Sequence, residues 1–135
     1  MIILDTSFIV AYYNTRDENH ERAAELMKTL VNGEYGDLRI TDYVFDECMT
    51  VMLIRLKSLP ETIKIGELIK KSMEIFSVGK EIFEESWILF KRQKETAFSF
   101  TDCTTLEVMK KMGMGNIATF DRDFKKVKSI NVIGF

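Results

Sequence analysis

Four acidic residues stand where a chain of this length could assemble an active site. They are Asp5, Glu47, Asp102 and Asp121, which are far apart in the sequence, and three of the four adjoin apolar runs typical of strands. In α/β folds, ligand and catalytic groups gather at the ends of such strands. Carboxylates brought together repel one another, so a site that holds several of them favours a hard cation. The pattern therefore predicts magnesium or manganese chemistry on a phosphate-containing substrate.

Two of these acids have a competing structural interpretation as helix caps. Asp5 follows the first apolar run and could be the N-cap of a short helix. Ser99 and Asp102 have the spacing of a capping box, in which Asp102 reaches back from the third helical position. The first turn of a helix can equally hold a metal ligand rigidly, so the sequence leaves both roles of Asp102 open.

Glu47 lies on the apolar stripe of a predicted helix. Val44 and Val51 are its neighbours on the same helical face. A lone carboxylate there would face a desolvation penalty of several kcal/mol unless it were paired or bound to a metal. The alternatives are a metal site and a buried salt bridge to Arg39 or Arg55. Buried acids of this kind mark functional sites, which favours the metal site.

Two further acids lie next to the candidates. Asp121 and Asp123 follow an apolar run as Asp-Arg-Asp. Asp121 is closer to the strand end and is the better candidate, whereas Asp123 could cap the next turn. Asp46, beside Glu47, is interpreted as a solvated acid favoured by the helix dipole.

Weaker candidates for substrate contact surround the acids. Thr119 could donate its hydroxyl to a phosphate or a water, and Ser7 lies close to Asp5 in the sequence. Arg122 and Lys125 follow Asp121 and could hold the flanking backbone of a nucleic acid. The alternative for the basic residues is a solvated helix face.

Composition bounds the class of protein. The chain has 135 residues, 46% apolar and 30% charged, with a net charge of −2, which is typical of one folded domain covering residues 1–135. Its two cysteines, Cys48 and Cys103, and its only histidine exclude a zinc site of the usual kind. We expect reduced cysteines and a cytoplasmic location, because the N-terminal apolar run is too short for a signal peptide and none approaches a membrane span.

Alternating apolar and amphipathic segments predict the elements that position these residues. Strands alternate with helices, which favours a mostly parallel sheet inside a three-layer α/β/α arrangement. The helix over 79–93 is expected to bury Phe83, Trp87 and Phe90. Strands are expected at 1–4, 38–40, 73–78, 117–120 and 130–135, and helices at 7–13, 16–31, 43–57, 60–71, 79–93 and 99–112.

Taken in order, the acidic segments resemble those of PIN-domain ribonucleases, and in particular the VapC-like toxins of toxin–antitoxin pairs. The resemblance covers essentially the whole chain. It lies in LDTSF around Asp5, in a helix-borne Glu47, in FTDC around Asp102, and in the TxDxDF pattern over residues 119–124. Each segment alone is a weak signal, and the ordered set is fairly specific.

The resemblance implies a metal-dependent endoribonuclease whose four acids line one negatively charged cleft. Asp5 and Asp102 would chiefly hold Mg²⁺ or Mn²⁺, with Glu47 and Asp121 completing the shell directly or through water. The substrate would be RNA. Toxins of this family dimerise and are silenced by a small antitoxin that inserts a segment into the cleft, so a homodimer and an antitoxin are expected partners.

Other functions stay open at this point. A PIN-type nuclease could process RNA outside a toxin system, or the domain could be a non-catalytic module that binds RNA or protein. An Asp at the end of a first strand is also the nucleophile of phosphohydrolases that form an aspartyl-phosphate. Those enzymes would be expected to carry a second Asp two residues later, where this chain has Ser7.

Overall fold

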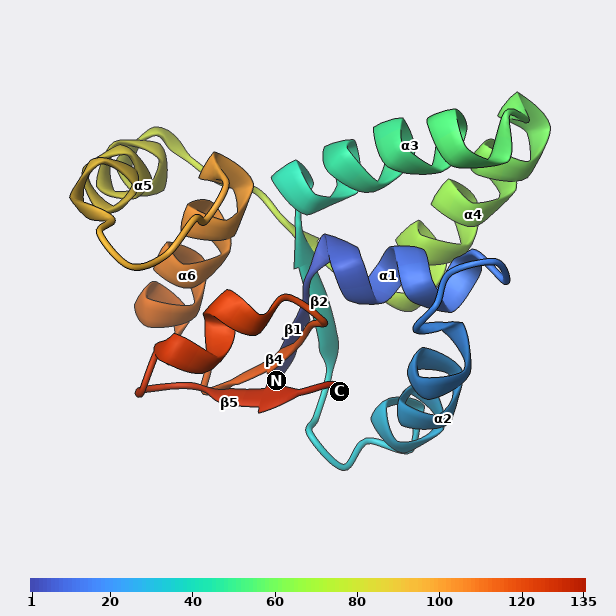
Figure 1. Ribbon diagram of the computed structural model, residues 1–135, viewed down its shortest axis with the longest axis horizontal. Helices are drawn as coiled ribbons and strands as arrows, with labels where there is room; N and C mark the ends of the chain where they lie inside the picture. Colours follow the sequence, from blue (N-terminus) through green and yellow to red (C-terminus); the bar gives the residue numbers. More distant parts are fainter.

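A five-stranded, all-parallel sheet with the order β3-β2-β1-β4-β5 forms the centre of the computed structural model, which describes all 135 residues. Helices α1 to α4 cover one face of this sheet, and α5 and α6 cover the other (Figure 1). The predicted three-layer α/β/α arrangement is therefore confirmed.

The strands are β1 (Ile2–Leu4), β2 (Leu38–Thr41), β3 (Glu74–Phe76), β4 (Asn116–Ala118) and β5 (Asn131–Ile133). The helices are α1 (Thr6–Tyr13), α2 (His20–Val31), α3 (Asp42–Leu56), α4 (Leu59–Ser72), α5 (Lys80–Arg92), α6 (Phe100–Met112) and the 3₁₀ helix η1 (Arg122–Lys126).

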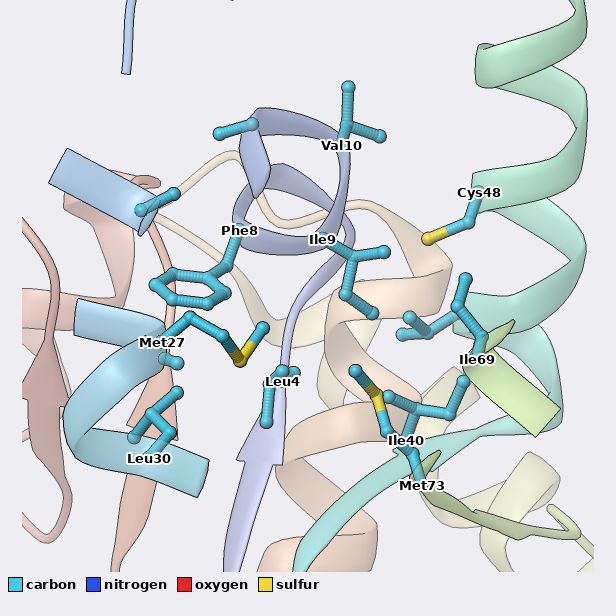
Figure 2. Close-up of a cluster of buried hydrophobic side chains, with 14 of the residues drawn as sticks. Leu4, Phe8, Ile9, Val10, Met27, Leu30, Ile40, Cys48, Ile69 and Met73 are labelled. Atoms are coloured by element: carbon cyan, nitrogen blue, oxygen red, sulfur yellow. The ribbon is translucent and has the colours of Figure 1, made fainter. Parts of the chain in front are cut away.

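Strand β1 is the central strand and is buried on both faces. Ile2 and Leu4 belong to the core under α1 to α4, whereas Ile3 belongs to the core under α5 and α6. Successive side chains of a strand point to opposite faces, so a short run of apolar residues serves both layers. In the first core, Cys48 of α3 points toward Ile9 of α1 (Figure 2), and both cysteines of the chain are buried and form no disulfide.

The direction of the strand order reverses at β1, and this reversal determines where the four acids lie. The chain proceeds from β1 to β2 on one side and returns to β4 on the other, so the helices after β1 and β2 and the loop after β4 meet at the same edge. The backbone N–H of Asp5 donates to the carbonyl of Ala118 at 3.0 Å, which joins the ends of β1 and β4. In open α/β sheets, ligands bind outside the carboxyl ends of the strands at such a point.

Side-chain caps determine where several helices begin. The hydroxyl of Thr41 accepts the N–H of Val44 at 3.0 Å at the start of α3. Ser58 caps α4, which carries Pro60 in its first turn. Both satisfy N–H groups that have no partner inside the helix.

Helix α2 begins at His20, four residues later than the sequence pattern predicts. The side chain of Asn14 accepts the N–H of Arg16 at 3.1 Å, and that of Asp17 accepts the N–H of Asn19 at 2.9 Å. Such side-chain acceptors compete with helical hydrogen bonds and stabilise turns. Residues 14–19 therefore form a turn segment between α1 and α2.

The prediction that α5 buries Phe83, Trp87 and Phe90 is wrong. These side chains are 37% to 46% exposed, and the buried positions of the helix are Ile82 and Ser86. Ser86 can be buried because its hydroxyl donates to the carbonyl of Ile82 at 2.6 Å. The buried stripe of this helix, which packs on the side of α6, is therefore the smaller of its two apolar stripes. None of the helices has the length and apolar character that a membrane span requires.

Candidate active site

The four predicted acids line one pocket of about 1000 Å³ at the carboxyl edge of the sheet. Asp5 lies between β1 and α1, and Glu47 lies on the second turn of α3. Asp102 lies in the first turn of α6, and Asp121 precedes η1. Four segments that are distant in the sequence thus bring their carboxylates to one cavity.

Asp5 is buried and is held by two hydroxyl groups. Its Oδ2 accepts a hydrogen bond from the hydroxyl of Ser7 at 2.8 Å and another from that of Thr119 at 2.7 Å. Burial raises the pKa of Asp5, and the negative charge of Asp121 raises it further, while the two hydroxyls act in the opposite direction. The carboxylate is therefore fixed in position but poorly solvated.

Asp102 combines the two roles that the sequence left open. Its Oδ2 accepts the N–H of Ser99 at 2.9 Å, and Ser99 Oγ accepts the N–H of Asp102 at 3.0 Å, so the capping box is present. The same side chain lines the pocket. Burial raises the pKa of Asp102 to about 7, and the charge of Asp5 contributes in the same direction. The cap thus holds a carboxyl group that is costly to ionise in the absence of a cation.

Glu47 is half-buried and has no ion-pair partner in the chain. The two arginines considered as partners are engaged elsewhere, because Arg39 pairs with Glu74 at 3.2 Å and Arg55 pairs with Asp17 at 3.4 Å. The buried salt bridge is therefore excluded as the explanation of Glu47. Glu47 lines the pocket, and no cationic side chain forms an ion pair with it.

Asp121 and Asp123 have different surroundings. Asp121 lines the pocket, and its Oδ1 accepts the N–H of Asp123 at 2.9 Å. Asp123 instead accepts the N–H of Ala97 at 2.8 Å and pairs with Lys126 at 2.9 Å, and these contacts lower its pKa. Asp46 is exposed and is not part of the pocket lining. Of these three acids, only Asp121 belongs to the site.

The structure places the hydroxyls of Ser7 and Thr119 against Asp5, and of these two residues only Ser7 lines the pocket. Thr119 is 0% exposed, so its hydroxyl reaches Asp5 and not the solvent-filled pocket. The hydroxyl of Ser7 accepts the N–H of Phe120 at 3.0 Å, and that of Thr119 accepts the N–H of Asp121 at 3.0 Å. The two hydroxyls thus connect Asp5 to the segment that carries Asp121.

Arg122 and Lys125 do not line the pocket. The guanidinium of Arg122 lies 5.1 Å from the ring centroid of Phe135, and the ammonium of Lys125 lies 3.9 Å from the same centroid. These are cation–π contacts with the last residue of the chain. Both predicted substrate contacts are corrected, because these side chains pack against the C-terminal aromatic ring.

Sequence reasoning missed a polar segment of the pocket. Asn14, Arg16 and Asp17 line it from the turn between α1 and α2, and Arg55 lines it from α3. The sequence predicted that α2 begins at residue 16, so most of this segment was assigned to a helix and not to a turn that lines the pocket. The alternation of Asn and Asp acceptors directly after an apolar helix was the available signal for a turn.

The donor set of the pocket fits a hard divalent cation. All four acids supply carboxylate oxygens, the ligands that Mg²⁺ and Mn²⁺ prefer. The raised pKa values of Asp5 and Asp102 arise partly from charges of neighbouring acids, a repulsion that a bound cation would relieve. No three acidic, cysteine or histidine side chains are arranged as ligands of a single ion in the structure. The pocket therefore brings the carboxylate donors together, but they do not form a complete coordination shell around one ion.

Comparisons with known proteins agree with this fold. A family model described as PIN domain matches residues 2–130. The 23S rRNA-specific endonuclease VapC20 of Mycobacterium tuberculosis is 27% identical over 132 residues, which cover 98% of this chain and 98% of that protein. A VapC ribonuclease of Archaeoglobus fulgidus is 24% identical over 124 residues, covering 90% of this chain and 78% of that protein.

Solved structures show the same architecture. The crystal structure of Mycobacterium tuberculosis VapC20, described as a toxin that cleaves the sarcin–ricin loop, matches with a TM-score of 0.86 at 24% identity and covers 96% of this chain and 97% of that one. A toxin–antitoxin complex from Klebsiella pneumoniae contains a chain that matches with a TM-score of 0.65 at 14% identity, covering 98% of this chain and 96% of that one.

Proposed function

Because this chain belongs to the PIN domain family, we propose that it is a metal-dependent endoribonuclease and the toxin of a toxin–antitoxin pair. The observation that carries the proposal is the single pocket lined by Asp5, Glu47, Asp102 and Asp121 at the switch point of the sheet. The relatives named as an rRNA endonuclease and a ribonuclease support RNA as the substrate.

The residues of the pocket have distinct tasks in this proposal. Asp5 and Asp102 would hold Mg²⁺ or Mn²⁺, with Glu47 and Asp121 completing the set of donors. When bound, such a cation offsets the carboxylate charges and acts as a Lewis acid toward a phosphodiester. The hydroxyls of Ser7 and Thr119 keep Asp5 from rotating, and the Ser99 cap does the same for Asp102. Preorganised ligands of this kind lose little freedom when the cation and substrate bind.

Two guanidinium groups could hold the RNA backbone. Arg16 and Arg55 line the same pocket as the acids, and Arg16 forms no ion pair within the chain. Arginine suits this task because its planar group donates two hydrogen bonds to a phosphate. We assign to these residues the backbone contacts that the sequence had suggested for Arg122 and Lys125.

The proposed partners are RNA, a small antitoxin and a second copy of this chain, all met in the cytoplasm. The toxin–antitoxin complex that shares this fold supports the antitoxin. An antitoxin segment with a cationic side chain would fit a pocket in which four carboxylates form no ion pair within the chain.

The test is RNA cleavage by purified protein with Mg²⁺ or Mn²⁺ on ribosomal RNA and on a messenger RNA. Asp5→Asn and Asp102→Asn are each expected to reduce the cleavage rate by at least about a thousandfold, because each removes a proposed cation ligand. Asp46→Asn is the matched control, since this exposed acid lies on the same helix as Glu47 but outside the pocket.

Two results would contradict the proposal. Undiminished cleavage by a folded Asp5→Asn protein would remove this acid from the active site. Failure of the unaltered protein to cleave any RNA with either cation would favour the non-catalytic binding module.

A further inference from the structure

A second cavity, of about 730 Å³, lies at the opposite end of α6 from Asp102. Helices α5 and α6 lie side by side (Figure 1), and the cavity is lined by their last turns and by the segments that lead into β4 and β5. It is therefore at the amino edge of the strands, and it has no lining residue in common with the acidic pocket. Ligand pockets usually have volumes of about 300–1000 Å³, so this cavity has the size of a small-molecule site.

The interior of this cavity is apolar. Seven of its lining residues are hydrophobic, and all seven belong to the core under α5 and α6 or pack against it. Phe98, Met109 and Met114 are buried, and Leu106 and Ile130 are half-buried. Apolar surface of this kind favours contact with an apolar group over contact with water. The cavity is therefore suited to the apolar body of a ligand.

The segment between α5 and α6, which forms one wall of the cavity, is held in shape by side-chain hydrogen bonds. Oε1 of Gln93 accepts the N–H of Phe98 at 2.6 Å and the hydroxyl of Thr96 at 2.8 Å. Nε2 of Gln93 donates to the carbonyl of Phe98 at 2.9 Å. The carboxylate of Asp123 holds the same segment from the other side, because it accepts the N–H of Ala97 at 2.8 Å. A wall fixed in this way loses little conformational freedom when a ligand binds.

The charged residues of this cavity are mostly cations. Arg92, Lys94 and Lys110 line it, are exposed and form no ion pair within the chain. Glu107 is the only acid among the lining residues. The helix dipole favours cations in the last turns of α5 and α6, which accounts for Arg92 and Lys110, but Lys94 lies beyond the end of α5. The cavity is therefore opposite in charge to the acidic pocket and favours an anion.

We propose that this cavity binds a small organic anion whose body is apolar. The body would contact Phe98, Met109 and Met114, and the anionic group would contact the exposed ammonium groups of Lys94 and Lys110. A nucleic acid is not favoured, because Phe98 is the only aromatic residue of the lining and is buried, so no ring is available for a base to stack on. The proposal goes beyond RNA cleavage and does not depend on it.

Octanoate, octanol and octylammonium test the proposal, because they share one apolar tail and differ in the charge of the head group. Binding is followed by NMR of protein with isotope-labelled methionine methyl groups, below the concentration at which octanoate forms micelles. Octanoate is expected to shift the methyl signals of Met109 and Met114 and to leave those of Met27 and Met52, in the other core, unchanged. Octanol should bind to this cavity at least about fivefold more weakly than octanoate, and octylammonium more weakly still.

Charge reversal at the cavity provides the test by mutation. Lys94→Glu combined with Lys110→Glu is expected to weaken octanoate binding by at least about tenfold and to change octanol binding by less than about twofold. Both lysines are exposed, so the variant should keep its fold. Lys91→Glu combined with Lys111→Glu is the matched control, because it changes the net charge equally at exposed residues outside the cavity. This control should bind octanoate as the unaltered chain does.

Four results would overturn the proposal. The methyl signals of Met109 and Met114 could fail to shift with octanoate, or the Lys94→Glu, Lys110→Glu protein could bind octanoate as tightly as the unaltered chain. Equal affinity for octanol and octanoate would show that the cavity takes apolar molecules regardless of charge. Shifts of these signals on raising the protein concentration alone would assign the cavity to a second copy of the chain. RNA cleavage by the same double variant reports separately on the proposed function.

Discussion

The carboxylate of Asp5 is supported by hydroxyl groups from two distant parts of the chain. Ser7 comes from the start of α1 and Thr119 from the end of β4, and both donate to the same oxygen of Asp5. Partners of this kind orient a ligand and are nearly as important for affinity as the ligand itself. The hydroxyls of this site are therefore best understood as positioning groups for an acid.

Thr119→Val tests this role, since valine retains the shape of threonine and removes its hydroxyl. We expect cleavage to fall about 10- to 100-fold, because Asp5 loses an orienting hydrogen bond. The Mg²⁺ concentration that gives half the maximal rate should rise, whereas a lost substrate contact would raise KM alone. Thr119→Ser keeps the hydroxyl and should retain most of the activity. A Val variant with an unchanged magnesium requirement would contradict the positioning role.

Asp102 makes the stability of the metal-free protein depend on pH. Burial raises its pKa to about 7 in the folded state, against an ordinary value of 3.8, so between these values the folded protein holds a proton that the unfolded chain has released. The free energy of unfolding should therefore fall as pH rises from about 4 to 7, by at most about 4 kcal/mol from this group. Asp102→Asn should be more stable than the unaltered protein at pH 8 in a chelator.

Urea unfolding at pH 5 and pH 8, with a chelator and then with Mg²⁺, checks this prediction. The difference between the two proteins should shrink at pH 5, where Asp102 is protonated, and Mg²⁺ should stabilise only the protein that keeps the acid. Asparagine can still accept the N–H of Ser99, so the capping box is retained. An Asn variant that is less stable at pH 8 without metal would contradict the argument.

At the level of single residues, the sequence identified four of the acids that line the pocket, but it missed Asp17 and Glu18 and the roles of the neighbouring residues. Glu47 could be predicted because a carboxylate on an apolar stripe requires an explanation. Thr119 could not, because its hydroxyl is directed by the pairing of β1 with β4, which is not visible in local sequence. Arg122 and Lys125 were misjudged since proximity in sequence to Asp121 does not determine which way a side chain points.

At the level of elements, the last strand holds the site together through a close backbone approach. Gly134 follows β5, and a Cβ atom added there would collide with the carbonyl oxygen of Thr119. The N–H of Thr119 donates to the carbonyl of Ile133 at 3.0 Å, so the two segments are tightly joined. Only glycine allows β5 to approach the segment that carries Thr119 and Asp121 so closely.

Gly134→Ala should therefore displace this segment and reduce both stability and cleavage. We expect a loss of about 1–3 kcal/mol in the free energy of unfolding, typical of forced overpacking. Gly79→Ala is the matched control, since a Cβ atom there meets nothing within 4 Å. Equal stability of the two variants in thermal unfolding would show that the backbone can yield at Gly134 without cost.

The order and type of the elements could be predicted, whereas some boundaries and faces could not. Strand β1 was evident as an apolar run that ends at Asp5, and α6 was evident from its cap at Ser99 and its closing Gly113. The turn before α2 was missed because Asn and Asp acceptors compete with the helix. The exposed face of α5 was missed since helical spacing cannot distinguish an apolar stripe that is buried from one that is exposed.

At the level of the whole molecule, the pocket depends on both halves of the sheet. Asp5 and Glu47 follow strands β1 and β2, whereas Asp102 and Asp121 come from the elements around β4. Separation of the two halves would therefore dismantle the site even if each secondary structure element persisted. A partner that inserts a positively charged side chain among these carboxylates would block the site without altering the fold.

The proposed toxin role predicts the behaviour of cells that produce this chain. Expression of the unaltered protein should slow growth, because cleavage of cellular RNA stops translation, and Asp5→Asn should grow normally at an equal level of soluble protein. Co-expression of a small protein encoded beside this chain should restore growth and should co-purify with it. Normal growth with abundant, RNA-cleaving protein would exclude the toxin role and favour an RNA-processing nuclease, because the two candidates share the pocket and differ only in the RNA that they reach.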